Sequence, residues 1–142
     1  MPSKTTVADL MTVDVVTLAE EQDVLFATSA MSLRRIRHLP VVRGEELVGL
    51  VSHRDLLRAQ AHFSAKTPRE EGKTIASVIA RDVMTADVRT VPPTMPADEA
   101  AMILVDTKFG CLPVVEDGRL VGIVTEADFL RWAVGVLGSA NS

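Results

Sequence analysis

The chain contains the same passage twice, at a constant separation of 73 residues. Residues 38–58, which begin HLPVVRGEELVGLVSHRD, align without a gap on residues 111–131, which begin CLPVVEDGRLVGIVTEAD, with 11 identities in 21 positions. The offset also holds upstream, where DLMTVDVVTL (9–18) matches DVMTADVRTV (82–91) at 6 of 10 positions. A chance similarity would not keep one offset over so long a span, so the chain is a tandem duplication.

The length of the chain predicts that the two copies fold together. With 142 residues it has the size of one domain, and each copy alone is too short to close a good core. We therefore expect the copies to pack on each other in a mixed α/β (α+β) fold. The boundaries predicted are repeat 1 at 1–61, a polar linker at 62–74, repeat 2 at 75–137 and a frayed tail at 138–142.

Each repeat has the pattern β-α-β-β-α. In repeat 1 the β-branched stretch DVVTL (14–18) predicts a strand, and apolar residues at helical spacing predict a helix over 23–35. The strands LPVV and LVGLVS surround the turn RGEE; in repeat 2 the turn is EDGR, whose Asp-Gly pair favours a hairpin. HRDLLRAQA and EADFLRWAV then predict the closing helices.

Composition narrows the class of protein. The net charge of −4 argues against broad nucleic-acid binding, which needs a basic face. The single cysteine, Cys111, cannot form an internal disulfide, which favours a reducing compartment. The N-terminus lacks the apolar core of a signal peptide, and no apolar run approaches the ~18 residues of a membrane span. We therefore expect a soluble cytoplasmic protein with neither a membrane nor a nucleic-acid partner.

The junctions between the last strand and the last helix carry the most informative motif. Ser52-His-Arg-Asp55 and Thr125-Glu-Ala-Asp128 each place a hydroxyl three residues before an acid, the signature of a helix N-cap. Capping alone would explain both. A helix N-terminus also favours a phosphate, and a carboxylate beside it can accept the hydroxyls of a ribose. The sequence leaves both interpretations open.

The ordered set D-x-M-T, x-x-x-L-P-V-V and L-V-G-h-V-[ST]-x-x-D, present twice, resembles the CBS domain, named after cystathionine β-synthase. Two such repeats in tandem resemble a CBS pair, or Bateman module, and the resemblance covers nearly the whole chain. It implies two pseudo-symmetric repeats packed sheet to sheet, with ligand clefts between them. It also implies a regulatory module that senses adenosyl compounds (AMP, ADP, ATP or S-adenosylmethionine) and signals to a partner protein in trans.

The resemblance also implies the site residues. In the family, the hydroxyl residue and the acid of the helix start serve the phosphate and the ribose, which makes Asp55 and Asp128 the expected ribose readers, beside Ser52 and Thr125. The residues expected around the base are Thr12, Thr17, Ile36 and Arg37 in repeat 1, and Thr85, Thr90, Phe109 and Gly110 in repeat 2. Strand propensity would equally explain Thr17 and Thr90, and core packing would explain Ile36 and Phe109.

The repeats differ in charge just before the L-P strand. Repeat 1 has Arg34, Arg35, Arg37 and His38, whereas repeat 2 keeps only Lys108. Cations at a helix C-terminus suit its dipole, which would account for Arg34 and Arg35.

In the family, the positions of Arg37 and His38 often touch phosphates. Arginine binds phosphate in a bidentate fork, so a di- or triphosphate is a candidate ligand, and Arg54 belongs to the same predicted set. Gly110 and Cys111 predict a weaker grip in repeat 2. We therefore expect two unequal sites.

No motif of an enzyme is present: there is no G-x-x-x-x-G-K-[ST] loop, no G-x-G-x-x-G after a strand and no H-E-x-x-H. We expect no catalytic residue and no cofactor; the adenosyl compound is a regulatory ligand that Mg²⁺ could accompany. CBS pairs commonly form disc-like dimers, so the resemblance also implies a homodimer. The regulated protein is not identifiable from the sequence.

Two alternatives to nucleotide sensing remain. A metal sensor could use His38 and His53, since imidazole is a common ligand of zinc and nickel, although no third ligand is evident. A protein-interaction scaffold with vestigial sites would need neither these histidines nor Asp55 and Asp128.

Overall fold

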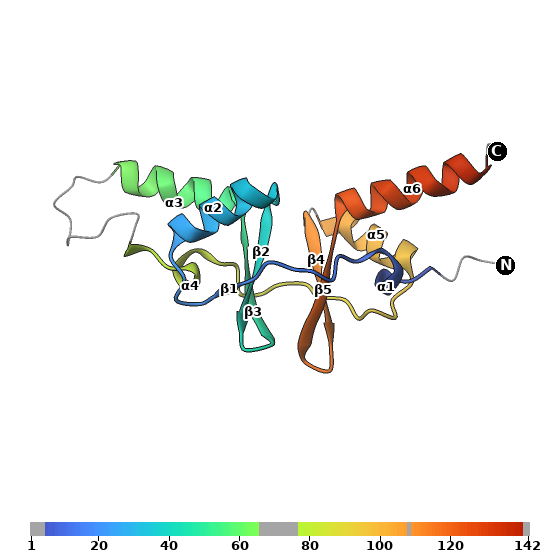
Figure 1. The fold of residues 1–142 in the computed structure, drawn as a ribbon, viewed down its shortest axis with the longest axis horizontal. Helices are drawn as coiled ribbons and strands as arrows, with labels where there is room; N and C mark the ends of the chain where they lie inside the picture. Colours follow the sequence, from blue (N-terminus) through green and yellow to red (C-terminus); the bar gives the residue numbers. More distant parts are fainter. Residues whose placement is uncertain (1–4, 66–76, 108, 141–142) are drawn as a thin grey trace. The chain divides into compact units, whose positions relative to one another are not determined.

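The computed structural model describes residues 5–65, 77–107 and 109–140 (Figure 1). The chain forms two compact units, and neither of them is one sequence repeat. Unit 1 consists of Met1–Val15 and Arg89–Ser142, and unit 2 consists of Val16–Val88. Each unit therefore combines the body of one repeat with the lead-in segment of the other. Most of the predicted linker, residues 66–74, lies outside the described residues.

Unit 2 is built on a three-stranded sheet in the order β1-β2-β3. β1 (Leu18–Ala19) runs parallel to β2 (His38–Arg43), and β3 (Glu46–Ser52) is antiparallel to β2. The described helices of this unit are α2 (Val24–Arg34), α3 (His53–Ala65) and the short α4 (Ala80–Val83). Figure 1 shows α2 and α3 near the end of the β2–β3 hairpin that lies away from its turn.

Unit 1 repeats this design. β4 (Cys111–Glu116) and β5 (Arg119–Thr125) form an antiparallel hairpin, and a single parallel bridge from Val91 to Val114 stands where unit 2 has β1. Its helices are α1 (Val7–Leu10), α5 (Ala97–Thr107) and α6 (Glu126–Ala140). The predicted mixed α/β fold of two related repeats is thus confirmed. No described helix is both long and apolar enough to cross a membrane.

Two element boundaries differ from the sequence prediction. The strand expected at 14–18 is wrong, because only Leu18 and Ala19 pair with β2. The preceding β-branched residues favour an extended backbone, but a strand also needs a partner, and β2 pairs only with that last part. Residues 138–140 of the expected tail are helical, since α6 continues to Ala140. No proline interrupts this end, and alanine is the strongest helix former.

The lead-in segments are exchanged between the repeats. We call residues 5–12 arm 1 and residues 78–85 arm 2. In arm 2, Thr85 exchanges two backbone hydrogen bonds of 2.9 Å with Leu50 of β3. In arm 1, Thr12 does the same with Ile123 of β5, at 2.8 and 3.0 Å. Each arm therefore extends the sheet of the other repeat, beside its return strand.

The arms also complete the two apolar cores. Val78 and Ala80 of arm 2 are buried in the core of unit 2, among residues such as Leu39 and Val51. Val7 of arm 1 is fully buried in the core of unit 1. Because the arms bury apolar side chains as well as pairing their backbones, each unit depends on both repeats for its stability.

Two glycines allow the arms to approach the return strands. A Cβ at Gly49 of β3 would stand 2.5 Å from Sδ of Met84 and 3.1 Å from the carbonyl oxygen of Thr85. A Cβ at Gly122 of β5 would stand 2.6 Å from Sδ of Met11 and 2.9 Å from the carbonyl oxygen of Thr12. Real Cβ atoms essentially never stand closer than 3.0 Å to another heavy atom, so a side chain at either glycine would displace the methionine of the arm and, at Gly122, the arm backbone as well.

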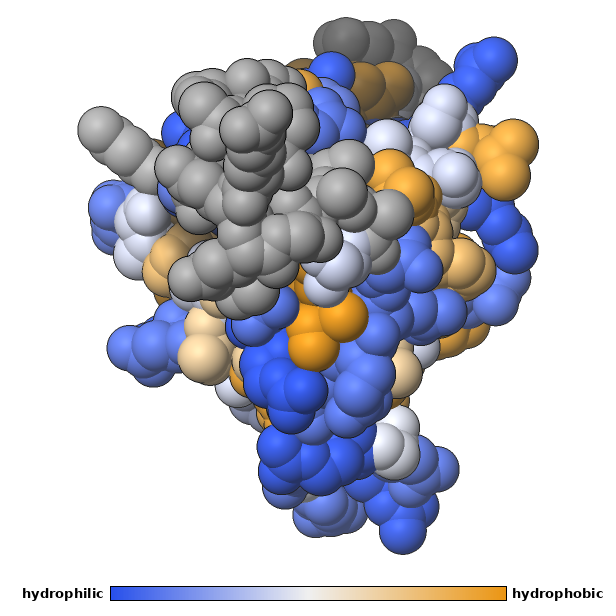
Figure 2. Space-filling model, turned by 90° about the vertical axis from the view of Figure 1, so that its left-hand side faces the viewer, coloured by the Kyte–Doolittle hydropathy of each residue, from blue (hydrophilic) through white to orange (hydrophobic). Residues whose placement is uncertain are grey.

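The hairpin turns follow from their residues. Asp117 and Gly118 both have positive φ (52° and 79°), as a two-residue type I′ turn requires, which confirms the Asp-Gly hairpin prediction. In the first hairpin Gly44 alone adopts positive φ, at 65°. Figure 2, which faces the side of unit 2, shows a mainly hydrophilic surface toward the turn of its hairpin.

Candidate functional site

The candidate site of unit 2 lies where β2 begins and β3 passes into α3. His38 stands opposite Ser52 in the register of β2 and β3. The carbonyl oxygen of Arg37 accepts a hydrogen bond of 2.8 Å from the backbone N–H of His53, the first residue of α3. Arg54 follows on the first turn of that helix. The structure thus brings these predicted residues to one edge of the sheet.

A capping box fixes the start of α3. The hydroxyl oxygen of Ser52 accepts from the backbone N–H of Asp55 at 3.1 Å. Oδ2 of Asp55 accepts from the backbone N–H of Ser52 at 2.8 Å and from its hydroxyl at 2.9 Å. Its other oxygen, Oδ1, lies 3.7 Å from the guanidinium of Arg58. The capping interpretation is therefore confirmed, and it occupies one carboxylate oxygen.

The start of α6 repeats this geometry in unit 1. Oδ2 of Asp128 accepts from the backbone N–H and the hydroxyl of Thr125, at 2.8 and 3.2 Å. Its Oδ1 is bound by Arg131 at 2.5 Å, a closer pair than its counterpart in unit 2. The carboxylates are nearly buried, with side-chain exposures of 10% for Asp55 and 5% for Asp128. Each helix start therefore holds a fixed carboxylate with one oxygen outside the cap.

The predicted threonines form a row across each sheet, and the row joins the two repeats. In unit 2 Thr17 directly precedes β1, so the register of β1 and β2 places it level with Pro40. Pro40 stands opposite Leu50 of β3, and Leu50 forms a backbone bridge to Thr85. Thr17 therefore shares a row with Thr85 of arm 2.

Unit 1 has the equivalent row from Thr90 to Thr12, through Pro113 and Ile123. The sequence prediction grouped Thr12 with Thr17 and Thr85 with Thr90, and this grouping is wrong. The exchange of the arms is the physical reason, because it moves each lead-in threonine onto the sheet of the other repeat.

The remaining predicted residues precede the two L-P strands. Ile36 is half-buried and packs against the core of unit 2, as its core interpretation expects. Phe109 is 39% exposed, and Gly110 beside it is half-buried. Cys111 is buried opposite Thr125, and this burial raises the pKa of its thiol to about 12. Cys111 therefore offers a ligand a neutral thiol and no charge.

The metal alternative gains no third ligand within the described residues. His38 and His53 lie at the same edge of unit 2, at the starts of β2 and α3. Within residues 5–65, 77–107 and 109–140, no group of three or more His, Cys, Asp or Glu side chains could hold a metal ion.

Comparison with known proteins assigns the chain to a family. The CBS domain family matches it twice, at residues 7–62 and 80–135. The chain belongs to the CBS-domain family, as a tandem pair, which confirms the resemblance seen in the sequence.

The curated relatives are longer proteins. Inosine-5'-monophosphate dehydrogenase of Thermoplasma acidophilum is 36% identical over 118 residues, which cover 82% of this chain and 21% of the relative. The uncharacterized protein MJ1225 of Methanocaldococcus jannaschii is 31% identical over 141 residues, which cover 95% of this chain and 47% of the relative. This chain thus spans about a fifth to a half of the length of these relatives, and it matches only that part of the enzyme.

Solved structures of similar size match nearly the whole chain. A protein described as the acetoin utilization protein AcuB, from Vibrio cholerae, has a TM-score of 0.84 and 34% identity over 99% of this chain and 98% of its own. CBSX2 in complex with AMP has a TM-score of 0.78 and 31% identity, covering 92% and 97%. The CBS pair of MJ0100, in complex with 5'-methylthioadenosine and S-adenosylmethionine, has 0.77 and 29%, covering 94% and 98%.

Proposed function

We propose that this chain is a regulatory module that binds an adenosyl compound at the helix-start edge of each unit and signals its occupancy to a partner protein in trans. One observation carries the proposal: each unit holds a nearly buried carboxylate with one oxygen outside its capping box, at the start of a long helix, on Asp55 and Asp128. The similar CBS proteins solved with AMP, or with methylthioadenosine and S-adenosylmethionine, support the ligand class.

Each part of the edge suits one part of an adenosyl ligand. The N-terminus of α3 or α6 attracts a phosphate or carboxylate, because its N–H groups carry a partial positive charge. Oδ1 of Asp55 or Asp128 accepts a ribose hydroxyl once the neighbouring arginine turns aside, and both arginines are mostly exposed and free to turn. The threonine rows offer hydroxyls to the base. We propose no catalytic residue and no cofactor, with Mg²⁺ as a companion of a polyphosphate ligand.

Thermal unfolding with AMP, ATP, S-adenosylmethionine and methylthioadenosine tests this function. A ligand at 100 times its Kd should stabilise the protein by about 2.7 kcal/mol, which raises Tm by roughly 5–10 °C. Asp55→Asn and Asp128→Asn keep one carbonyl oxygen for the cap but lose the negative charge. Each substitution should therefore remove the rise in Tm that is due to ligand binding at its own site.

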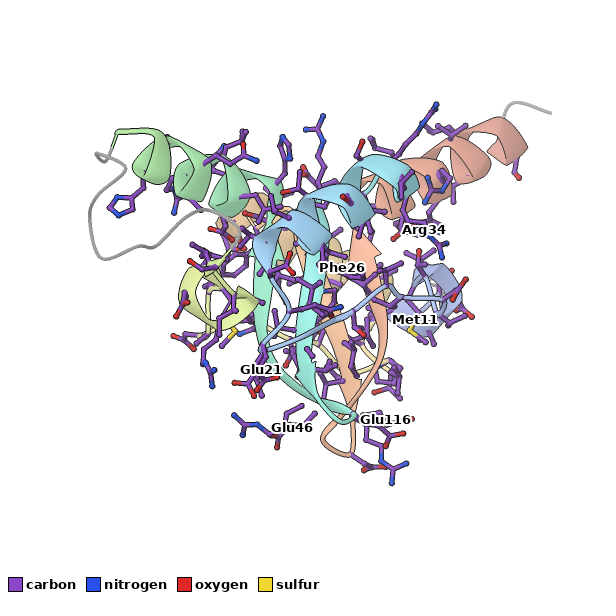
Figure 3. All side chains as sticks on the ribbon, turned by 60° about the vertical axis from the view of Figure 1, so that its left-hand side comes forward. Met11, Glu21, Phe26, Arg34, Glu46 and Glu116 are labelled. Atoms are coloured by element: carbon purple, nitrogen blue, oxygen red, sulfur yellow. The ribbon has the colours of Figure 1, made fainter. Side chains whose placement is uncertain are left out.

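Glu46→Gln and Glu116→Gln are the matched controls. Both residues stand at the hairpin turns, where Figure 3 shows them far from the helix starts, and both should keep the full shift. A protein freed of co-purified ligand that gave no shift with any of the four compounds would contradict the proposal.

The output of such a module needs a protein contact, and α6 offers one. Leu130, Val134 and Leu137 follow each other at helical spacing and are 66%, 69% and 62% exposed. Contiguous exposed apolar residues of this kind mark interaction surfaces. We propose that a homodimer in the cytoplasm covers them.

Light scattering on the purified chain tests the dimer. Leu130→Glu with Val134→Glu should give a monomer, because a charge cannot be buried in an apolar contact without a partner. Gln60→Glu, on the exposed surface of α3, should keep the dimer. A wild-type chain that is monomeric at high micromolar concentration would overturn this part of the proposal.

A further inference from the structure

We propose that the two units sort adenosyl ligands by charge: unit 2 takes nucleotides with phosphate chains, and unit 1 takes an uncharged or cationic adenosyl compound. This inference rests on the proposed function and assigns a different ligand class to each site. The fold gathers different charges at the two helix-start edges.

Unit 2 gathers exposed arginines that have no ionic partner among the residues that the structure describes. Arg34 is the last residue of α2, Arg35 is its C-cap, Arg37 directly precedes β2, and Arg54 is in the first turn of α3. All four are exposed, and no carboxylate among the described residues pairs with any of them. Arg43, elsewhere in this unit, is bound to Glu20 at 2.9 Å, so missing partners are not a general feature of its arginines.

The backbone keeps these arginines close to the site. Arg35 adopts a left-handed conformation with φ of 55°, which is uncommon for a residue with a side chain. This residue ends α2, so that only Ile36 and Arg37 separate the helix cap from the start of β2. Figure 3 shows Arg34 at the end of unit 2 that lies away from Glu46 and the hairpin turn. Arg34 therefore lies away from the acidic residue of the hairpin turn.

Among the described residues, the equivalent edge of unit 1 carries mainly negative charge. The 73-residue offset replaces Arg34, Arg37 and Arg54 by Thr107, Gly110 and Ala127, and replaces His53 by Glu126. Lys108, the counterpart of Arg35, lies outside the described residues. The only arginine at this described edge, Arg131, is already bound to Asp128.

Carboxylates dominate the rest of that edge. Asp106 stands near the end of α5, and Glu126 and Asp128 stand in the first turn of α6. The half-exposed ring of Phe109 and the neutral thiol of Cys111 add no positive charge.

The two edges therefore favour different ligands. Unpaired guanidinium groups bind phosphate oxygens in bidentate pairs. A ligand with more phosphates can form more of these pairs and should therefore bind more tightly. At the edge of unit 1 the carboxylates would repel a phosphate chain. They would not repel the uncharged thioether of methylthioadenosine, and they would attract the positively charged sulfonium of S-adenosylmethionine. ATP and ADP should select unit 2, and methylthioadenosine and S-adenosylmethionine should select unit 1.

Position 54 and its counterpart 127 give a matched experiment. Both are exposed and in the first turn of a helix, so Arg54→Ala and Ala127→Arg exchange the two side chains without disturbing a core. Calorimetric titrations with ATP, AMP, methylthioadenosine and S-adenosylmethionine would be made on the full chain, with Asp55→Asn and Asp128→Asn to assign each site. Thermal melts without ligand check that every variant is folded.

The expected result is a change in the relative affinities of each unit for the different ligands. Arg54→Ala, combined with Arg37→Ala, should lower the preference of unit 2 for ATP over AMP by about tenfold or more and leave methylthioadenosine binding unchanged. Ala127→Arg should strengthen ATP binding at unit 1 and weaken that of S-adenosylmethionine. In the wild type, ATP affinity should fall with added salt, while methylthioadenosine affinity should not.

Two failures can be told apart. If AMP and methylthioadenosine bind both sites equally, or if the arginine variants leave the ATP-to-AMP ratio unchanged, charge sorting is wrong while the proposed function stands. If no adenosyl compound binds the folded wild type at all, the proposed function itself fails.

Discussion

At the scale of single residues, Gly49 and Gly122 control how closely the arms approach the sheets. The two positions are equivalent in the repeats, but their surroundings differ in one respect. At both positions the atom closest to a new Cβ is the Sδ of a flexible methionine, but the backbone oxygen is 2.9 Å away at Gly122 and 3.1 Å away at Gly49. A side chain can move aside more easily than a paired backbone, so the two sites differ in tolerance.

Gly122→Ala should therefore destabilise the protein by about 1–3 kcal/mol, and Gly49→Ala by less. Urea unfolding of both variants measures the difference. Gly135→Ala is the control, because it lies in α6 with no atom within 4 Å of a new Cβ. It should stabilise the chain by roughly 0.5–1 kcal/mol through helix propensity. An equally small loss of unfolding free energy at positions 49 and 122 would show that the arms lie farther from β3 and β5 than the structure places them.

Cys111 gives a second prediction at this scale. Burial raises the pKa of its thiol to about 12, so almost no thiolate exists in the folded protein near neutral pH. Iodoacetamide should react with Cys111 at the rate of unfolding, and quickly in urea. Mass spectrometry of samples taken over time measures this rate. Fast modification of the folded protein at pH 8 would contradict the buried position.

At the scale of elements, one ion pair joins the end of β1 to β2. Arg43 binds both oxygens of Glu20, at 2.9 and 3.2 Å, and the backbone N–H of Arg81 in α4 donates to the carbonyl oxygen of Glu20 at 3.0 Å. The hydrogen bond from Arg43 lowers the pKa of Glu20 below its ordinary value of 4.5. Glu20 therefore links β1, β2 and arm 2.

The lowered pKa fixes the sign of the pH dependence. The stabilisation by Glu20 is fully present above pH 4.5, the ordinary pKa of the unfolded chain, and is lost as the pH falls through the lower pKa of the folded state. Glu20→Gln should be less stable than the wild type at pH 7, and the difference should shrink below about pH 4.5. Urea unfolding at several pH values measures it. A difference that grows on acidification would contradict this pairing.

The elements predicted from local patterns are those whose partners lie nearby in the sequence. The two hairpins, α2, α3 and α6 follow from turn residues, helical spacing and caps, and the cap residues Ser52 and Thr125 were identified for the same reason. The arms were missed because their partners are distant: nothing in TTVADLMT specifies pairing with residue 123.

The error in grouping Thr12 and Thr85 has the same origin. One signal was available in the sequence, since a glycine repeated within both return strands indicates a close backbone approach.

At the scale of the whole molecule, each unit is assembled from two separate stretches of chain. Residues 1–65 contain one repeat and arm 1, but lack arm 2, which supplies Val78 and Ala80 to the core of unit 2. Residues 77–142 likewise lack arm 1 and its buried Val7. Neither half holds a complete unit.

Fragments 1–65 and 77–142 should therefore be largely unfolded when separate, and should regain structure when mixed. Circular dichroism of each fragment and of the mixture measures this, and a fragment pair with Gly122→Ala should associate more weakly. If either fragment alone melted cooperatively at the temperature of the full chain, the arms would not be needed for its fold.

The exchange of arms also bears on the history of the gene. Immediately after duplication, two copies that completed only themselves could have drifted apart or been separated. Once each copy supplied the arm that completes the other, the loss of one would have removed a backbone bridge, part of a core and a threonine from its sibling. The structure therefore disfavours the loss of either repeat, while the surface charges around each helix start, which no arm contributes, are free to diverge.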